Sequence, residues 1–373
     1  MKKSIKAIIL LFFLFLNFES FSQFVKLENY NFINYKDNKI EFFGSSEKKF
    51  TPLFEKIKHT IALGTDQVRV LHIGDKQTLD NVFVSQIYYN LSLTLDGLES
   101  RRGMLWNETT TLKPNKEIEY QVTDYNKKGD LLCKRFRLYH SPLNDSISIY
   151  INDIESSYKT IYFEDKGYSV FEITNPINTV NLKIINNSSE NFIIYGHYLE
   201  SKNAGFIYDI ISGNRIISDI DILEKRYQNL LKTISFDMVV ISLGEDAAYS
   251  PSYFSDSFKQ DIKGLLKRLR LINPNIPILL TTPHDYYVNN KPNNRLELAT
   301  QDLIEIAKTS NCAIWNFYKI MGSKGSSENW RRNSLMDNKK TTLTDKGSVF
   351  QGELYYNALW QSFENYISKT NWY

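Results

Sequence analysis

The sequence predicts an α/β protein whose doubly wound parallel sheet is interrupted by an all-β sandwich. A buried, β-branched run over 68–73 stops at Gly74 and Asp75 and passes directly into a helical apolar pattern. Strand and helix patterns alternate again from about residue 204, which is typical of a parallel sheet with helices on both faces. Between these parts, residues 98–200 show short alternating runs separated by turn signals, the pattern of a sandwich.

Length and composition fit two domains after processing. The chain has 373 residues, of which 42% are hydrophobic and 23% charged, enough to bury full cores. We place an N-terminal segment and the first part of the α/β domain at 23–97, a jelly-roll-like sandwich at 98–200, and the rest of the α/β domain at 201–373. The formal net charge of +3 is close to neutral for this length, so we expect no nucleic-acid partner.

Residues 1–22 have the pattern of a signal peptide. A basic start precedes an apolar run over 7–16, and Ser20-Phe21-Ser22 supplies small residues at the cleavage position. The apolar run is short for a bilayer, so an uncleaved anchor is the less favoured alternative and we expect no membrane span after cleavage. The protein is therefore expected to be exported, to the periplasm, the cell surface or the extracellular medium.

Apolar periodicity predicts the order of the elements. An amphipathic segment near 54–61 precedes the first strand, and a helix over 82–91 follows it. Within the sandwich we expect strands at 117–122, 136–139, 146–151, 179–185 and 192–196. After it we expect helix 220–234, strand 237–243, helix 258–272, strand 276–280, a helix through 296–306, strand 312–317, a long loop and a terminal helix around 354–367.

The chain has two cysteines, Cys133 and Cys312, which fall in different predicted domains. In an exported protein they can pair as a disulfide. We favour the alternative, in which each is a small buried hydrophobic residue.

The residues at the predicted carboxyl ends of the strands resemble the sequence blocks of the SGNH (GDSL-type) hydrolases, in particular secreted members of the Bacteroidetes type. The first turn, 72–78, resembles block I, which in those members reads His-Ile-Gly-Asp-Ser-His. The run 237–249 resembles block III, and 208–215 is a weaker match to block II. Residues 279–283 and 315–326 also look like these members, and 342–347 falls where the family has His-Phe-Thr-x-x-Gly. The resemblance implies the family's three-layer, flavodoxin-like fold and an ancestry among ester hydrolases.

The same resemblance implies that the catalytic groups are substituted. The family uses a serine nucleophile, a histidine base, an aspartate that orients it, and Gly and Asn donors for the oxyanion. The serine position is Lys76, and the Asn position is Asp246. The aspartate position is Lys339, and the histidine position is Thr342. The block II glycine corresponds to Gly213 or is replaced by Ser212, so we expect no catalytic residues.

An ion pair is our hypothesis for the former site. Lys76 stands at the first strand end, next to Asp75, and Asp246 or Glu245 stands at the second. Because removing one partner of a partly buried pair leaves an uncompensated charge, Lys76→Ala should lower the melting temperature more than a surface lysine change does.

Other polar residues receive ordinary interpretations. We interpret His72 as a hydrogen-bonded core residue, and Thr78 and Ser242 as N-cap and strand residues. His284, followed by Asp285, ends a strand near the site and is a candidate for a displaced acid or base. No histidine follows His284, so no shift of the alignment restores the family base. The five histidines show no metal-ligand spacing, so we expect neither a metal nor a cofactor.

Three functions remain open. The first is a catalytically inactive SGNH-like protein that binds a polysaccharide or serves as a scaffold, because secreted relatives typically act on acyl groups of envelope or extracellular glycans. The second is an active ester hydrolase, such as a glycan deacetylase, with an unorthodox site around Lys76, Asp246 and His284. The third is a subunit that binds an envelope protein. The aromatic residues of the predicted sandwich suit sugar rings, although for any one of them we favour a core position: Trp106, Tyr139, Tyr150, Tyr158, Tyr162, Phe163 and Tyr168.

Overall fold

The structure is a computed structural model that describes most of the chain. The described residues are 24–75, 81–94, 101–102, 104–105, 110–123, 133–152, 154–155, 159–163, 166–177, 179–200, 204–213 and 234–370. The predicted signal peptide, almost all of the helix predicted at 220–234, and both Lys76 and Thr78 lie outside them.

A central sheet of seven strands confirms the predicted α/β class. Its spatial order is β1 (Ile40–Phe42), β19 (Ala313–Trp315), β16 (Ile278–Thr281), β15 (Met238–Ser242), β2 (Gln67–Asp75), β14 (Gly205–Gly213) and β3 (Arg101–Arg102). The pairs from β19 to β3 are parallel, and β2 lies inside the sheet between β15 and β14. Strand β1 was not predicted and runs antiparallel to β19. It has three residues, too few to show an alternating pattern.

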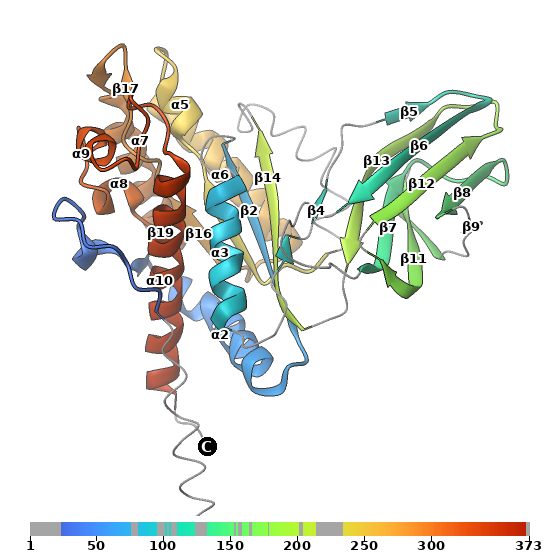
Figure 1. Ribbon diagram of the computed structural model, residues 1–373, viewed down its shortest axis with the longest axis horizontal. Helices are drawn as coiled ribbons and strands as arrows, with labels where there is room; N and C mark the ends of the chain where they lie inside the picture. Colours follow the sequence, from blue (N-terminus) through green and yellow to red (C-terminus); the bar gives the residue numbers. More distant parts are fainter. Residues whose placement is uncertain are drawn as a thin grey trace, which may run out of the picture.

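Helices cover both faces of this sheet. On one face lie α2 (Ser46–Leu63), α3 (Asn81–Thr94) and α10 (Asp345–Lys369), and on the other lie α6 (Ser255–Ile272) and α7 (Arg295–Thr309). Figure 1 shows α3 and α10 side by side in front of the sheet, with α6 behind it. Strand β2 serves both cores, because Val68 and Val70 face the first set while Leu71 and Ile73 face the second.

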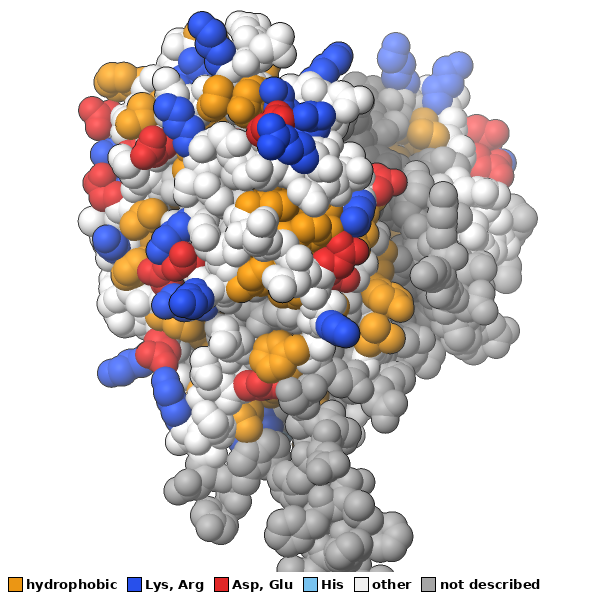
Figure 2. All heavy atoms as spheres, turned by 60° about the vertical axis from the view of Figure 1, so that its left-hand side comes forward, with side chains coloured by type: hydrophobic (Ala, Val, Ile, Leu, Met, Phe, Trp, Pro, Cys, Tyr) orange, Lys and Arg blue, Asp and Glu red, His pale blue; other side chains and the backbone are white. Residues whose placement is uncertain are grey.

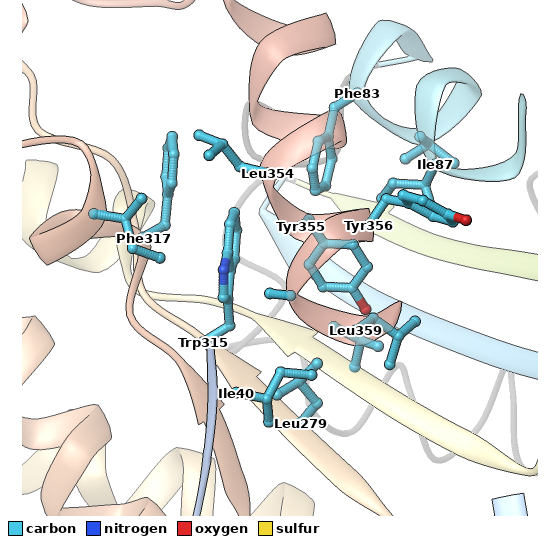
Figure 3. Close-up of a cluster of buried hydrophobic side chains, with 14 of the residues drawn as sticks. Ile40, Phe83, Ile87, Leu279, Trp315, Phe317, Leu354, Tyr355, Tyr356 and Leu359 are labelled. Atoms are coloured by element: carbon cyan, nitrogen blue, oxygen red, sulfur yellow. The ribbon is translucent and has the colours of Figure 1, made fainter. Parts of the chain in front are cut away.

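Aromatic side chains join α3, α10 and the sheet into one core (Figure 3). The ring of Tyr355 on α10 lies 5.3 Å from that of Trp315 and 6.1 Å from that of Phe83, both edge to face. The helices also approach closely, since a Cβ on Gly352 of α10 would come within 2.8 Å of Cβ of Gln86. Glycine is therefore required at this crossing.

The carboxyl-terminal third contains more helix than predicted. Helix α10 starts at Asp345, well before the predicted region around 354–367, because the side chain of Thr344 accepts a hydrogen bond from the N–H of Gly347. The region predicted as a long loop contains α8 (Phe317–Ile320) and α9 (Ser327–Arg332). Further short elements are the 3₁₀-helix η1 (Tyr35–Asp37), helix α5 (Glu245–Tyr249) and the hairpin β17 (Tyr287–Val288) and β18 (Lys291–Pro292).

Strands β4 to β13 form a second region, which we call the β unit. One sheet has the order β10-β11-β7-β13-β4, with β5 also paired to β13, and the other has the order β6-β12-β8-β9. Their bounds are β4 Met104–Leu105, β5 Thr110–Leu112, β6 Lys116–Thr123, β7 Cys133–His140, β8 Ile147–Ile151, β9 Ile154–Glu155, β10 Lys159–Phe163, β11 Lys166–Ile177, β12 Thr179–Asn186 and β13 Phe192–Glu200. Figure 1 shows the unit gathered to one side of the central sheet.

The β unit has its own core and also contributes to the α/β core. Side chains from both of its sheets pack together, among them Phe136, Leu182 and Phe192. Tyr139 and Tyr168 are buried instead in the cluster that contains α6 and α7, so these two aromatic residues are core residues, as we favoured. That the unit is a separate inserted domain with bounds at 98 and 200 stays a prediction.

Two further observations bear on the sequence analysis. Cys312 is a free, fully buried cysteine, and burial raises the pKa of its thiol to about 11. Within the described ranges no helix has the length and apolar character that a membrane span needs. The face in Figure 2 carries side chains of both charges, with small apolar patches between them.

Candidate functional site

The carboxyl ends of three neighbouring parallel strands bring the predicted site residues together. Strand β2 ends at Asp75, β15 leads through Gly244 to Glu245, and β16 is followed by His284. Because β16, β15 and β2 are adjacent, these ends meet at one edge of the sheet, as the parallel fold predicts. We call Asp75, Glu245, Asp246 and His284 the carboxyl-end site.

Asp75 caps the start of helix α5. Its Oδ2 accepts hydrogen bonds from the backbone N–H groups of Gly244 at 2.9 Å, Glu245 at 2.9 Å and Asp246 at 3.2 Å. Gly244 suits this turn, since its φ is +122° and a Cβ would lie 3.2 Å from the ring of Phe258. Burial raises the pKa of Asp75 well above its ordinary value, and the nearby charges of Asp246 and Glu245 raise it further.

His284 and Glu245 form a buried pair. Nδ1 of His284 lies 3.6 Å from Oε2 of Glu245, and its Nε2 lies 3.3 Å from the carbonyl oxygen of Thr341. A carbonyl only accepts, so Nε2 carries a proton. Nδ1 then faces the carboxyl group of Glu245. The ring of His284 therefore connects the start of α5 to the turn that carries Thr341.

Asp285, beside His284, has a structural role. Its Oδ2 accepts hydrogen bonds from N–H of Ser327 at 3.1 Å and from Oγ of Ser327 at 2.6 Å. These bonds attach the start of α9 to the end of β16. Burial raises the pKa of the Asp285 carboxyl.

The positions aligned with the family aspartate and histidine lie on a turn organised by Asp337. Its Oδ1 accepts hydrogen bonds from the N–H groups of Thr341 at 2.7 Å and Thr342 at 3.4 Å, and its Oδ2 accepts from Oγ1 of Thr341 at 2.8 Å. Lys339 is exposed in this turn. The turn contacts the site through the carbonyl of Thr341 on His284, which the sequence did not predict.

His72 and Ser242 are core residues, as predicted. The ring of His72 is fully buried, with Nδ1 at 2.9 Å from the hydroxyl of Tyr208 and Nε2 at 2.5 Å from Oγ of Ser242. Ser242 also lies 2.5 Å from Oγ1 of Thr281. Burial lowers the pKa of His72 to about 3, so the ring stays neutral and acts as a hydrogen-bonded spacer between strands.

Aromatic rings lead from the buried pair to the surface. The ring of Tyr286 lies 5.7 Å from that of His284 and 6.4 Å from that of Tyr249, and its hydroxyl donates to the carbonyl of Glu245 at 2.9 Å. Tyr249 ends α5 and is 61% exposed. Arg295 fixes its position, donating to the carbonyls of Ala248 at 2.7 Å and Tyr249 at 3.2 Å. Sequence reasoning gave no role to Tyr249, because exposure depends on how α5 and α7 pack.

The carboxyl-end site is acidic in its described part, and its histidine is paired with one carboxylate. No group of three or more His, Cys, Asp or Glu side chains stands in metal-binding arrangement among the residues that the structure describes. The ion pair predicted for Lys76 stays a prediction, since Lys76 lies outside those residues. Glu245, one of its two predicted partners, contacts His284.

Comparisons with known proteins identify the fold. No protein-family model matches the sequence, and no curated protein matches it significantly. A solved structure described as a peptidoglycan O-acetylesterase matches with a TM-score of 0.66, over 87% of this chain and 99% of that chain, at 16% sequence identity. The chain has the SGNH hydrolase fold. The SGNH resemblance seen in the sequence therefore led to the correct fold.

Two further solved structures match over less of the chain. An acetyl xylan esterase matches at 17% identity and a TM-score of 0.34, over 41% of this chain and 81% of that chain. A GDSL-like lipase from Bacteroides thetaiotaomicron matches at 14% identity and a TM-score of 0.31, over 43% of this chain and 76% of that chain. Both scores are too low to add to the argument. The SGNH fold does not by itself establish which catalytic positions are substituted.

Proposed function

We propose that this SGNH-fold protein is exported, binds an O-acylated cell-envelope glycan at its carboxyl-end site, and does not hydrolyse the ester. One observation carries the proposal: Asp75, Glu245 and Asp246 gather around the start of α5. Ester hydrolysis needs hydrogen-bond donors at such a site, because negative charge develops on the carbonyl oxygen in the transition state. The described part offers carboxylates instead.

Two further features argue against ester hydrolysis. The backbone N–H groups of Gly244, Glu245 and Asp246 already donate to the side chain of Asp75, so an oxyanion would compete with that acceptor for them. The serine position in the sequence is Lys76, and an ammonium group is not a nucleophile unless it loses its proton.

Glycan binding fits the exposed part of the site. The side chain of Asp246 is partly exposed, whereas those of Asp75 and Glu245 are buried, so Asp246 can accept hydrogen bonds from sugar hydroxyls. Tyr249 presents a ring that is 61% exposed and held from behind by Tyr286, a suitable surface for the apolar face of a sugar. An O-acetylated polymer is the first ligand to test, because the structure that matches most of this chain is described as a peptidoglycan O-acetylesterase.

The catalytic part of the proposal is tested with p-nitrophenyl acetate and the purified mature protein, beside Lys76→Ser and Lys76→Ala. We expect no turnover above background from the wild type. Wild-type turnover that disappears in Lys76→Ala would show that the lysine is catalytic and would contradict the proposal.

The buried pair of His284 and Glu245 favours a second candidate, an ester hydrolase in which Glu245, positioned by His284, takes a proton from the attacking water. This candidate predicts wild-type turnover that falls at least a hundredfold in His284→Gln and Glu245→Gln, typical of the loss of a general base. Turnover in Lys76→Ala would stay high, which separates this mechanism from a catalytic lysine.

The binding part is tested by sedimentation with O-acetylated peptidoglycan sacculi and with sacculi deacetylated by mild alkali. We expect the protein to bind the acetylated sacculi more tightly, and Tyr249→Ala to weaken that binding about tenfold, the value of one stacking contact. Tyr89→Ala is the matched control, since Tyr89 is a tyrosine of α3 that is 44% exposed. Equal loss in both variants, or no binding by the wild type, would contradict the proposal.

A further inference from the structure

A cavity of about 490 Å³ lies at the opposite end of β2 from Asp75. Its lining includes Lys56, Gln67, Arg69, Arg135, Arg137 and Glu200. Lys56 belongs to α2, Gln67 and Arg69 to the start of β2, and the other three to β7 and β13 of the β unit. We call it the amino-end cavity. It lies between the α/β part and the β unit, and it shares no lining residue with the carboxyl-end site.

Three arginines converge on one carboxylate in this cavity. Glu200, whose side chain is 2% exposed, accepts from Nη2 of Arg137 at 2.9 Å, Nη1 of Arg135 at 3.2 Å and Nη1 of Arg69 at 3.5 Å. The side chains of Arg69, Arg135 and Arg137 are 15%, 30% and 14% exposed. Their charges are therefore only partly screened by water, which strengthens their interaction with any anion that enters.

The remaining charges near the cavity are distributed as follows. Lys56 pairs with Asp237 at 2.8 Å, and Arg135 also pairs with Glu172 at 2.8 Å. Asp66 contributes a second carboxylate to the lining. Behind Arg69, the hydroxyl of Tyr198 donates to buried Asp209 at 3.1 Å. The lining thus presents four cationic groups against two carboxylates, and Asp237 and Glu172 stand at its margin.

We propose that the amino-end cavity binds an acidic sugar, with Arg69, Arg135 and Arg137 donating to its carboxylate or phosphate oxygens. A guanidinium group offers paired N–H donors that match both kinds of oxyanion. The cavity volume is in the range of small-molecule sites and leaves room for the rest of the sugar. Glu200 neutralises the arginines in the absence of ligand. Because the arginines come from both regions, a bound anion also links the α/β part to the β unit.

The experiment is calorimetric titration of the mature protein with glucuronate, glucose 6-phosphate, inorganic phosphate and glucose. We expect glucuronate or glucose 6-phosphate to bind, glucose not to bind, and inorganic phosphate to bind at least tenfold more weakly than its sugar ester. Equal affinity for inorganic phosphate and glucose 6-phosphate would overturn the sugar part of the proposal. Absence of heat with every anion would overturn all of it.

Variants locate the binding in the cavity. Arg135→Gln should weaken binding of the acidic sugar at least tenfold, whereas Arg332→Gln, a change at an exposed arginine of α9, should leave it unchanged. Glu200→Gln should tighten binding several-fold, because it removes the internal competitor for the same arginines. Unchanged affinity in Arg135→Gln would overturn the proposal.

Circular dichroism checks that each variant keeps its fold. If Glu200→Gln does not fold, Arg135→Gln and Arg332→Gln still decide the outcome. Tyr249→Ala should not alter binding of the acidic sugar, so this proposal and glycan binding at the carboxyl-end site can fail separately.

Discussion

The two ends of the central sheet handle buried charge in opposite ways. At the carboxyl end, Asp75 accepts hydrogen bonds from backbone N–H groups at the start of α5, and Glu245 pairs with His284. At the amino end, one buried glutamate is compensated by three arginines. Strand β2 contributes to both, with Arg69 near its start and Asp75 at its end.

The difference comes from what packs on each end. Helix α5 starts where β15 ends, so its N–H groups are available to carboxylates by the geometry of the fold itself. The amino end combines Arg69 of β2 with Arg135 and Arg137 of β7, a strand of the β unit. Open α/β sheets place ligands at their carboxyl ends. Here the β unit contributes to a cavity at the opposite, amino end of the sheet.

Breaking the charge cluster at the amino end should have the largest effect. Glu200→Ala leaves three partly buried arginines without their shared carboxylate, and we expect the free energy of unfolding to fall by about 3 kcal/mol. Urea denaturation measures it. Glu305→Ala, which removes a carboxylate with a 52% exposed side chain from Lys259, should cost well under about 1 kcal/mol. Similar losses in the two variants would show that the cluster is no more than a surface network.

At the carboxyl end the acceptor oxygen should matter more than the charge. Asp75→Ala leaves three N–H groups of α5 without their acceptor and should cost about 2 kcal/mol. Asp75→Asn keeps an acceptor oxygen and should cost less.

The same pair of variants has a pH signature. Because the folded-state pKa of Asp75 is raised, the wild type loses stability as the pH rises above the ordinary value of 3.8, and the Asn variant does not. The stability of Asp75→Asn relative to the wild type should therefore increase with pH. A constant difference from pH 4 to 8 would mean that Asp75 is ionised in the folded protein.

Asp209, which lies behind the amino-end cavity, should make the stability of the protein fall gradually as the pH rises. Burial raises the pKa of its carboxyl to about 7, although Arg69 and the hydroxyl of Tyr198 oppose the shift. Its contribution to stability is full below about pH 4 and is lost as the pH rises toward 7, with a slope of at most about 1.4 kcal/mol per pH unit. Thermal unfolding at pH 5 and at pH 7 tests this. The loss of stability between the two pH values should be smaller in Asp209→Asn than in the wild type.

The smallest expected effect is that of salt on ligand binding, which should differ between the amino-end cavity and the carboxyl-end site. Raising NaCl from about 50 to 500 mM screens partly exposed arginines and should weaken binding of the acidic sugar a few-fold. Binding of acetylated sacculi, which depends on the ring of Tyr249, should change little. Parallel salt dependence of both ligands would mean that they share one site.

Most of the fold could be predicted because buried parallel strands carry a strong signal. The apolar runs of β2 and β15 and the amphipathic stripes of α6 and α7 are visible in the sequence, and the structure confirms all four. Strand β1 escaped prediction because three residues contain no periodicity. Helix α10 begins earlier than its apolar pattern predicts, because the cap at Thr344 adds turns that the apolar periodicity does not mark.

The sequence predicts which residues form the candidate site, but not which of them contact one another. Chain order alone places Asp75, Glu245 and His284 at neighbouring strand ends, and they do meet. The pairing of Glu245 with His284 depends on side-chain direction, which periodicity does not give. The amino-end cavity depends on strand register, since Arg135 faces Glu200 only through the pairing of β7 with β13. No local pattern in the sequence encodes that register.

Strand β1 and the segment before it affect the order in which the chain folds. Strand β1 pairs with β19, and the backbone of Val25 exchanges two hydrogen bonds with Asn357 of α10, 332 positions away, at 3.0 and 2.9 Å. Such contacts form only after nearly the whole polypeptide is present, and they slow folding because a long loop must close first. The outer edge of the sheet therefore stays unpaired on a partial chain. The edge of the central sheet is therefore completed only when the last helix, α10, is present.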